Sequence, residues 1–203
     1  MTGPMGVILA GGRATRMGGG DKGLHALGPC RILDHVIARL APQCAGLALN
    51  ANGDPARFAE FGLPVLPDSL DGHLGPLAGV LAGLDWAAQR GANSIITAAA
   101  DTPFFPKELV ERLARGVGPT GLCLAASPDA TGTLRRHPTF GLWPVSLRHD
   151  LRGALLDGQR KMMTWADHHN AGTAVFSGAE GDPFFNINTP DDIARAERRL
   201  AAR

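Results

Sequence analysis

The feature that most constrains this chain is a short apolar run that leads into a glycine-rich, basic segment near the N-terminus. Residues 6–24 read GVILAGGRATRMGGGDKGL. The apolar part, residues 5–10, predicts a buried strand. The glycines that follow allow positive φ angles and let a ligand come close to backbone N–H groups. Because Arg13, Arg16 and Lys22 lie among these glycines, the segment is a candidate phosphate-binding loop rather than a merely flexible connection.

Strand patterns and helix patterns alternate along the first two-thirds of the chain. Further strands are predicted at 46–52 and 94–100, and helices at about 32–40, 75–91 and 106–116. The run at 94–100 is uniformly apolar or small, as expected for a parallel strand that is covered on both faces. This alternation predicts a three-layer α/β/α fold, Rossmann-like, with a mostly parallel sheet.

The last third of the chain is less regular. Its patterns indicate strands near 121–127, 136–143 and 173–177, helices near 146–157 and 160–168, and a final helix from Pro190. We expect these elements to form an antiparallel edge of the same sheet or a small cap on it. Because neither a linker nor a repeat divides the 203 residues, we predict a single domain.

The bulk composition excludes several classes of protein. Lys and Arg number 20 against 19 Asp and Glu, so the net charge is +1 and no overall field favours nucleic acid or an anionic membrane. Apolar stretches fall short of the roughly 18–20 residues of a membrane span, and the N-terminus lacks the pattern of a secretory signal. Three widely spaced cysteines without a CxxC pair are typical of a reducing compartment. We expect a soluble, cytoplasmic protein that binds neither nucleic acid nor a membrane.

Two familiar phosphate-binding patterns can be tested on the glycine-rich segment. The Walker pattern fails because Lys22 is preceded by Asp21 and followed by Gly23. The dinucleotide pattern G-x-G-x-x-G is present in form at Gly18, Gly20 and Gly23, but it neither follows the strand directly nor opens a helix. We therefore interpret that match as accidental.

The remaining pattern, L-A-G-G-x-x-x-R-M-G-G-x-D-K, resembles the signature loop of nucleotidyltransferases that activate sugars and cofactors with a nucleoside triphosphate. The LAGG opening and the Asp before the Lys most resemble the molybdenum cofactor guanylyltransferases. The resemblance implies that Arg16 and Lys22 hold the β- and γ-phosphates and stabilise the leaving pyrophosphate. It also implies nucleotide contacts from Leu9, Ala10, Gly11 and Gly12.

A second stretch, VLPDSLDGHLGPLAGVLAGL, agrees with this resemblance. The Gly-Pro-x-x-Gly turn from Gly75 to Gly79 would let a flat base lie against the backbone at a helix N-terminus, although a plain helix start is the alternative. The resemblance makes Asn50 and Asp68 nucleotide contacts as well, through the base or the ribose.

Asp101 follows directly after the apolar strand at 94–100. Open α/β sheets bind ligands at the carboxyl ends of their parallel strands, and Mg²⁺ prefers oxygen ligands that it shares with substrate phosphates. A cap of a local turn is the alternative role. The resembled family holds its metal at this turn, so we expect Asp101 to be the Mg²⁺ ligand.

The acceptor side is predicted from the C-terminal part. Asn186 and Asn188 are two residues apart and so share one face of an extended segment, whereas Thr189 is explained as the N-cap of the final helix. The resemblance places N-x-N-T-P on the acceptor side of the cleft, and whether either asparagine touches the metal stays open. It also places His137 and Arg160 at an anionic pterin phosphate, with a solvated basic face as the alternative.

The resemblance implies an Mg²⁺-dependent enzyme that transfers GMP from GTP to the terminal phosphate of Mo-molybdopterin and releases pyrophosphate. Residues 1–105 would bind the nucleotide and residues 106–203 the acceptor, within one domain. Transient contacts with other molybdenum cofactor enzymes are also implied. A cytidylyltransferase and a non-catalytic guanine-nucleotide-binding protein are the alternative functions.

Overall fold

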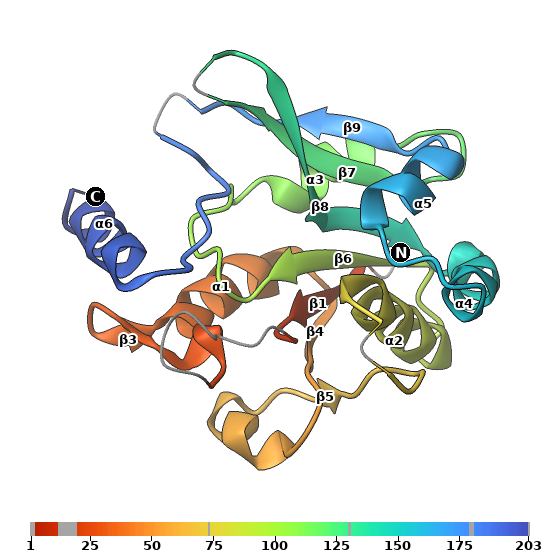
Figure 1. Cartoon of the computed structure of the whole chain (residues 1–203), viewed down its shortest axis with the longest axis horizontal. Helices are drawn as coiled ribbons and strands as arrows, with labels where there is room; N and C mark the ends of the chain where they lie inside the picture. Colours follow the sequence, from red (N-terminus) through yellow and green to blue (C-terminus); the bar gives the residue numbers. More distant parts are fainter. Residues whose placement is uncertain (1–2, 12–19, 73, 130, 179–180, 203) are drawn as a thin grey trace.

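A seven-stranded sheet forms the centre of the computed structural model, which describes residues 3–11, 20–72, 74–129, 131–178 and 181–202. The strand order is β5-β4-β1-β6-β8-β7-β9 (Figure 1). The strands are β1 (Met5–Leu9), β4 (Gly46–Asn50), β5 (Val65–Leu66), β6 (Ser94–Ala99), β7 (Cys123–Pro128), β8 (Leu134–Pro144) and β9 (Gly172–Val175). Four strand pairings are parallel and two are antiparallel. The predicted α/β fold with a mostly parallel sheet is confirmed.

The C-terminal third of the chain adds β8, β7 and β9 to one side of the sheet, as expected, and β8 is its antiparallel strand. β8 pairs antiparallel with both β6 and β7, so it is the third strand from that edge and not the edge strand itself. Its pattern indicates a strand but carries no information on its neighbours, because pairing is decided by how the chain folds back. The edge on that side is β9, which runs parallel to β7.

Helices cover both faces of the sheet and make the three layers. They are α1 (Ile32–Leu40), α2 (Pro76–Gln89), α3 (Leu109–Arg115), α4 (Arg148–Leu156), α5 (Met162–His168) and α6 (Pro190–Ala201). Apolar side chains of α1 and α3 pack in one core, and those of α2, α4 and α5 pack in the other. α6 packs on the hairpin of β2 (Ala26–Leu27) and β3 (Cys30–Arg31), far from α4 (Figure 1).

Short elements between these helices and strands escaped the sequence analysis. They are the hairpin of β2 (Ala26–Leu27) and β3 (Cys30–Arg31), the strand β5, and the 3-10 helices η1 (Lys22–Leu24), η2 (Ala41–Gln43), η3 (Pro55–Phe61) and η4 (Val145–Leu147). Strands of two residues and 3-10 helices of three residues are too short to show a hydrophobic period. In the described part of the chain, no helix is long and apolar enough to cross a membrane.

The three central strands end at one level, and this register positions the site. Leu9, the last residue of β1, lies opposite Asn50 of β4 and Ala99 of β6. The Ala10 N–H donates to the Asn50 carbonyl at 2.9 Å, and the Ala100 N–H donates to the Leu9 carbonyl at 3.1 Å. The residues that follow the three strands are therefore brought together at the carboxyl edge of the sheet.

Candidate active site

A cavity of about 390 Å³ opens at this carboxyl edge. It is bordered by the ends of β1, β4 and β6, by the N-terminus of α2 and by the segment that precedes α6. Nine of the predicted site residues line it: Leu9, Ala10, Gly11, Lys22, Asn50, Asp68, Gly75, Asp101 and Asn186. Gly12 and Arg16 lie outside the described residues.

One side of the cavity is a network of amides around a carboxylate. The Asn50 side chain, only 4% exposed, donates through Nδ2 to the Leu66 carbonyl at 3.1 Å and to Asp68 Oδ1 at 3.0 Å. Asn52 donates to Asp68 Oδ2 at 2.7 Å and accepts the Asp68 N–H at 2.9 Å. Each Asp68 oxygen thus receives one hydrogen bond and keeps acceptor capacity for a ligand. Asn52 was missed, although its position two residues after Asn50 in LNAN was a usable signal.

The two glycines predicted at the start of α2 have different roles. Gly75 lines the cavity with φ +75°, a backbone conformation that favours glycine. It precedes Pro76, so the N-terminus of a 14-residue helix, a favourable place for anions, borders the cavity. Gly79 is buried and is not among the residues that line the cavity. A Cβ there would lie 2.1 Å from Asn50 Oδ1, so Gly79 is needed for packing against a site residue.

Lys22, Asp101 and Asn188 meet at the centre of the site. Lys22 Nζ lies 3.3 Å from Asp101 Oδ2 and also donates to Asn188 Oδ1. Asp101 Oδ1 accepts a hydrogen bond from the Thr102 hydroxyl at 3.2 Å. The Asp101 carbonyl accepts the Ile187 N–H at 2.9 Å, which holds the asparagine segment against the end of β6. An ammonium group beside a carboxylate suits the binding of phosphates together with a cation.

The residues present fit a divalent cation that is shared with a substrate. Among the described residues, no group of three His, Cys, Asp or Glu could hold a metal by itself. Asp101 offers one partly exposed carboxylate, and Asn186 offers an amide oxygen in the same cavity. A hard cation such as Mg²⁺ usually takes one or two carboxylates and completes its shell with phosphate oxygens and water.

The N-terminus of α6 holds Asn188 in place. The Thr189 hydroxyl accepts the Asp192 N–H at 3.2 Å, and Asp192 Oδ2 accepts the N–H groups of Asn188 and Thr189 at 3.1 and 3.0 Å. The predicted N-cap role of Thr189 is thereby confirmed. Burial raises the pKa of the Asp192 carboxyl, but the hydrogen bonds from Asn188 and Thr189 outweigh it and leave the pKa below its ordinary value.

The predicted acceptor residues His137 and Arg160 are not among the residues that line this cavity. His137 stacks on Phe184 with ring centroids 4.4 Å apart and bonds through Nε2 to the Ser127 hydroxyl at 2.8 Å. Burial lowers its pKa, while Asp182 opposes and Arg135 adds to that shift. Arg160 donates through Nη1 to the Leu155 and Gln159 carbonyls at 2.7 and 2.8 Å. The two side chains line no common cavity among those found in the described part of the chain.

Thr139 lines the cavity and was missed by the sequence analysis. The register between β7 and β8 jumps, because Leu124 pairs with Gly141 whereas Ala125 pairs with His137. The intervening residues of β8 therefore form a bulge, a feature that often redirects side chains beside active sites. Pro138 within the strand pattern was the available signal, since proline inside a strand often marks a bulge.

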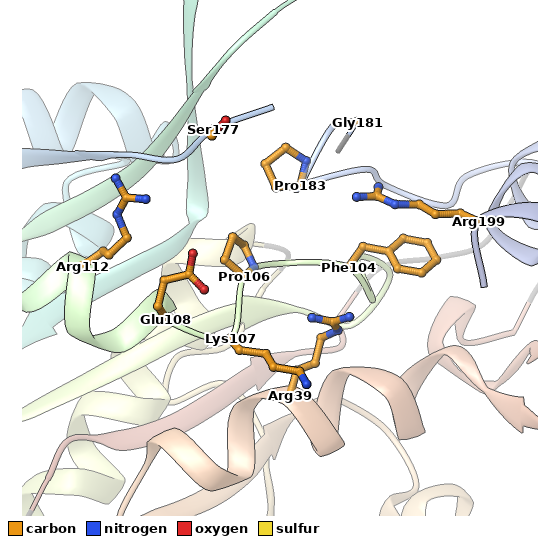
Figure 2. Close-up of a pocket in the computed structure, with 10 residues that line it drawn as sticks. All are labelled: Arg39, Phe104, Pro106, Lys107, Glu108, Arg112, Ser177, Gly181, Pro183 and Arg199. Atoms are coloured by element: carbon orange, nitrogen blue, oxygen red, sulfur yellow. The ribbon is translucent and has the colours of Figure 1, made fainter. Parts of the chain in front are cut away.

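A larger cavity, of about 480 Å³, lies outside the candidate site (Figure 2). Its arginines donate to backbone carbonyls: Arg39 to Phe105 at 3.0 Å, and Arg112 to Val175 at 2.5 Å. Arg199 donates to the Asp182 carbonyl at 2.6 Å and stacks over the Phe104 ring at 4.6 Å. These contacts connect α1, α3 and α6 to neighbouring segments, so we assign the arginines a structural role.

Comparisons with known proteins show the family of this chain. Residues 6–172 match the family described as the MobA-like NTP transferase domain. A molybdenum cofactor guanylyltransferase from Bradyrhizobium sp. is 51% identical over 201 residues, which cover 97% of this chain and 92% of that protein. Another, from Rhodopseudomonas palustris, is 53% identical over 197 residues, with 95% and 91% covered.

Solved structures agree on the fold. The molybdopterin-guanine dinucleotide biosynthesis protein A of Archaeoglobus fulgidus superposes with a TM-score of 0.71 at 24% identity, covering 98% of this chain and 100% of that one. The 4-diphosphocytidyl-2C-methyl-D-erythritol synthase of Anaerococcus prevotii has a TM-score of 0.70 at 13% identity, with 98% and 96% covered. At these identities the likeness shows the fold alone. The family match and the relatives at about half identity show that the chain belongs to the molybdenum cofactor guanylyltransferases, a family of nucleotidyltransferase enzymes with a MobA-like NTP transferase domain.

Proposed function

We propose that this enzyme transfers GMP from GTP to the terminal phosphate of Mo-molybdopterin and forms the guanine dinucleotide cofactor. An oxygen of the acceptor phosphate attacks the α-phosphorus of GTP, a new P–O bond forms, and the bond to the β-phosphate breaks to release pyrophosphate. The observation that carries the proposal is the single cavity that holds Lys22 and Asp101 beside the Asn50–Asp68 network. The names of the relatives support the choice of reaction.

The nucleophile of this reaction is already anionic, so alignment and charge neutralisation carry most of the catalysis. We assign Lys22 to the β- and γ-phosphates, together with Arg16 and the backbone of Leu9, Ala10, Gly11 and Gly12. Asn50, Asp68 and Gly75 are assigned to the base or the ribose. The free acceptor capacity of Asp68 suits the N–H donors of guanine or the ribose hydroxyls.

The family implies a divalent metal, and we propose that it is Mg²⁺ held by Asp101. When bound, Mg²⁺ would act as a Lewis acid on the triphosphate. Lys22 keeps the Asp101 carboxylate oriented toward the cavity, and Asn186 or Asn188 is a candidate further ligand. Because Asn188 Oδ1 accepts from Lys22, Asn186 has the freer amide oxygen of the two in this state.

The acceptor is assigned to the C-terminal part, residues 106–203, and the nucleotide to residues 1–105 of the same domain. Asn186, which lines the cavity, is assigned to the acceptor, and His137 and Arg160 would meet the pterin phosphate at the periphery of the site. We also propose a cytoplasmic location, supported by three free cysteines. Transient contacts with other molybdenum cofactor enzymes would hand over the labile acceptor and product.

Release of pyrophosphate from GTP in the presence of Mo-molybdopterin tests the proposed reaction. We expect pyrophosphate and the dinucleotide product in equal amounts, and we expect the activity to be lost in EDTA and restored by Mg²⁺. Replacing GTP with CTP distinguishes the cytidylyltransferase alternative, which would prefer CTP. Tight GTP binding without any pyrophosphate release would instead favour the non-catalytic nucleotide-binding protein and would contradict the proposal.

A further inference from the structure

Arg57 makes a long-range ion pair with the end of the glycine-rich segment. Its Nε lies 2.5 Å from Asp21 Oδ2, and its Nη2 donates to Asp21 Oδ1 at 3.5 Å. Asp21 comes directly before Lys22, which begins η1. The ion pair therefore connects η3, which follows β4, with the residue beside the lysine of the candidate site.

The Arg57 guanidinium makes three further contacts. Nη1 donates to the Asp54 carbonyl at 2.8 Å, and Nη2 donates to the Asn52 carbonyl at 2.6 Å. The guanidinium carbon also lies 4.8 Å from the centroid of the Phe58 ring. Donors on all three nitrogens and a stacked ring hold this fork in one orientation. The position of Asp21 is thereby fixed relative to the backbone of Asn52.

Asn52 and Lys22 belong to opposite sides of the cavity. Asn52 holds the Asp68 carboxylate through its amide, and Lys22 meets Asp101 and Asn188. Arg57 and Asp21 are not among the residues that line the cavity. Arg57 thus stands behind the cavity and connects the side assigned to the base or ribose with the side assigned to the phosphates.

A neighbouring arginine offers a direct comparison. Arg31 also pairs with a carboxylate, Glu60, and also lies over a phenylalanine ring, that of Phe61, on the same 3-10 helix η3. The Glu60 side chain is 73% exposed, whereas the Asp21 side chain is only 17% exposed. Exposed ion pairs contribute little because water screens them. The less exposed Arg57–Asp21 pair, with its two backbone acceptors, provides a more rigid connection.

We propose that Arg57 is a positioning residue that acts through Asp21 to hold Lys22 where it meets the triphosphate. The proposal rests on the proposed function, because it takes the phosphates to lie beside Lys22. Without Arg57, the backbone at Asp21 loses its anchor and the lysine amine can leave its place beside Asp101. A displacement of about 1 Å in such a group can cost about a hundredfold in rate.

The test measures binding of GTP and of guanosine to Arg57→Ala by calorimetry, together with steady-state kinetics. We expect GTP affinity and kcat/KM for GTP to fall about tenfold, as for the loss of a hydrogen bond to a charged group. Guanosine affinity should stay within about twofold, because guanosine lacks the phosphates that Lys22 binds. Arg31→Ala is the matched control and should leave both affinities unchanged.

Two further variants distinguish positioning from a general loss of structure. Asp21→Asn should reproduce the loss in GTP affinity, and the double variant should lose no more than either single variant. Arg57→Lys keeps the positive charge but lacks the planar guanidinium, so we expect an intermediate loss in GTP affinity. This variant replaces Arg57→Ala in the test if Arg57→Ala does not fold. Additive losses, or equal losses for GTP and guanosine, would overturn the inference. If the wild-type protein binds no GTP, the proposed function itself has failed.

Discussion

The carboxyl edge of β1, β4 and β6 and the region of β7, β8, α4 and α5 use their polar side chains in different ways. At the edge, Lys22, Asn50 and Asp101 bind neighbouring polar groups around one cavity of about 390 Å³. In the second region, Arg160 binds carbonyls of its own segment and His137 binds Ser127 and stacks on Phe184, and neither residue is among those that line that cavity.

The difference follows from strand direction. β1, β4 and β6 are parallel and in register, so the residues that follow them come together at one edge of the sheet. β8 runs antiparallel to its neighbours and is interrupted by a bulge, so its side chains are distributed along the sheet. We therefore expect substitutions at the edge to have large effects on transfer and substitutions in the second region to have small ones.

Asp101→Ala should have the largest effect, because it removes the carboxylate assigned to the metal beside Lys22. We expect pyrophosphate release to fall about a thousandfold or more, with the protein still folded. Glu111→Ala, which removes an exposed carboxylate paired with Arg115 on α3, is the control. Metal-dependent transfer at the wild-type rate in Asp101→Ala would refute the assignment of the metal.

Lys22→Ala should have the second largest effect on transfer. Loss of a positioned ammonium group from the leaving pyrophosphate should cost about 2–4 kcal/mol of transition-state stabilisation, by analogy with a lost oxyanion donor. The measurement is kcat/KM for GTP, and Lys107→Ala, which lies outside the candidate site, serves as the control. An unchanged kcat/KM in Lys22→Ala would mean that the carboxyl edge is not where the phosphates bind.

Gly79→Ala tests whether a residue behind the cavity matters as much as one that lines it. The new Cβ would lie 2.1 Å from Asn50 Oδ1 and 3.0 Å from Leu9 Cδ2, so Asn50 must move and lose its bonds to Leu66 and Asp68. We expect the free energy of unfolding to fall by about 1–3 kcal/mol and GTP binding to weaken.

The matched control for this substitution is Gly153→Ala in α4. A Cβ at Gly153 meets nothing within 4 Å, so the unfolding free energy should stay the same or rise by about 0.5–1 kcal/mol. Urea titrations of both variants give the comparison. A Gly79→Ala protein with unchanged stability and unchanged GTP affinity would show that Asn50 can adapt.

His137 should have the smallest effect, and we expect it in the pH dependence of the free energy of unfolding. Burial holds its folded pKa below the ordinary value of 6.5, so above pH 6.5 the ring is neutral in both states and its contribution to stability is fully present. As the pH falls through 6.5 the unfolded chain takes up a proton that the folded protein resists, and unfolding becomes easier. Urea titrations at pH 7.5 and 5.5 measure this decline.

His137→Phe keeps an aromatic ring against Phe184 but cannot titrate. We expect its stability to decline less than that of the wild-type protein between the two pH values. Transfer by this variant should change mainly through the KM for the acceptor, with the KM for GTP unchanged. A rise in the KM for GTP would mean that the second region reaches the nucleotide after all.

Much of this fold can be predicted because local patterns encode backbone conformation. Apolar runs located β1 and β6 and a helical apolar pattern located α1, each to within a residue or two, and the Thr-Pro-Asp-Asp sequence located the start of α6. The glycine-rich segment, the carboxylate after β6 and the asparagines before α6 could be named as candidate site residues from short patterns and from the family that these patterns resemble. Each is a short pattern whose chemistry does not depend on distant neighbours.

Other features depend on contacts between residues that are far apart in the sequence. Arg57 and Asp21 are separated by 36 positions, and Lys22 and Asn188 by 166. Gly79 is required only because α2 packs on Asn50, and Thr139 reaches the cavity only through the β8 bulge.

By itself, then, the sequence determined the kind of elements, the parallel core and the chemistry available at the ends of its strands. The tertiary structure alone decided that β8 lies inside the sheet, that His137 and Arg160 do not line the cavity that holds Lys22, and that Arg57 connects the two sides of that cavity. The physical reason is that local patterns set φ, ψ and hydrophobic faces, whereas strand order and register set which side chains become neighbours.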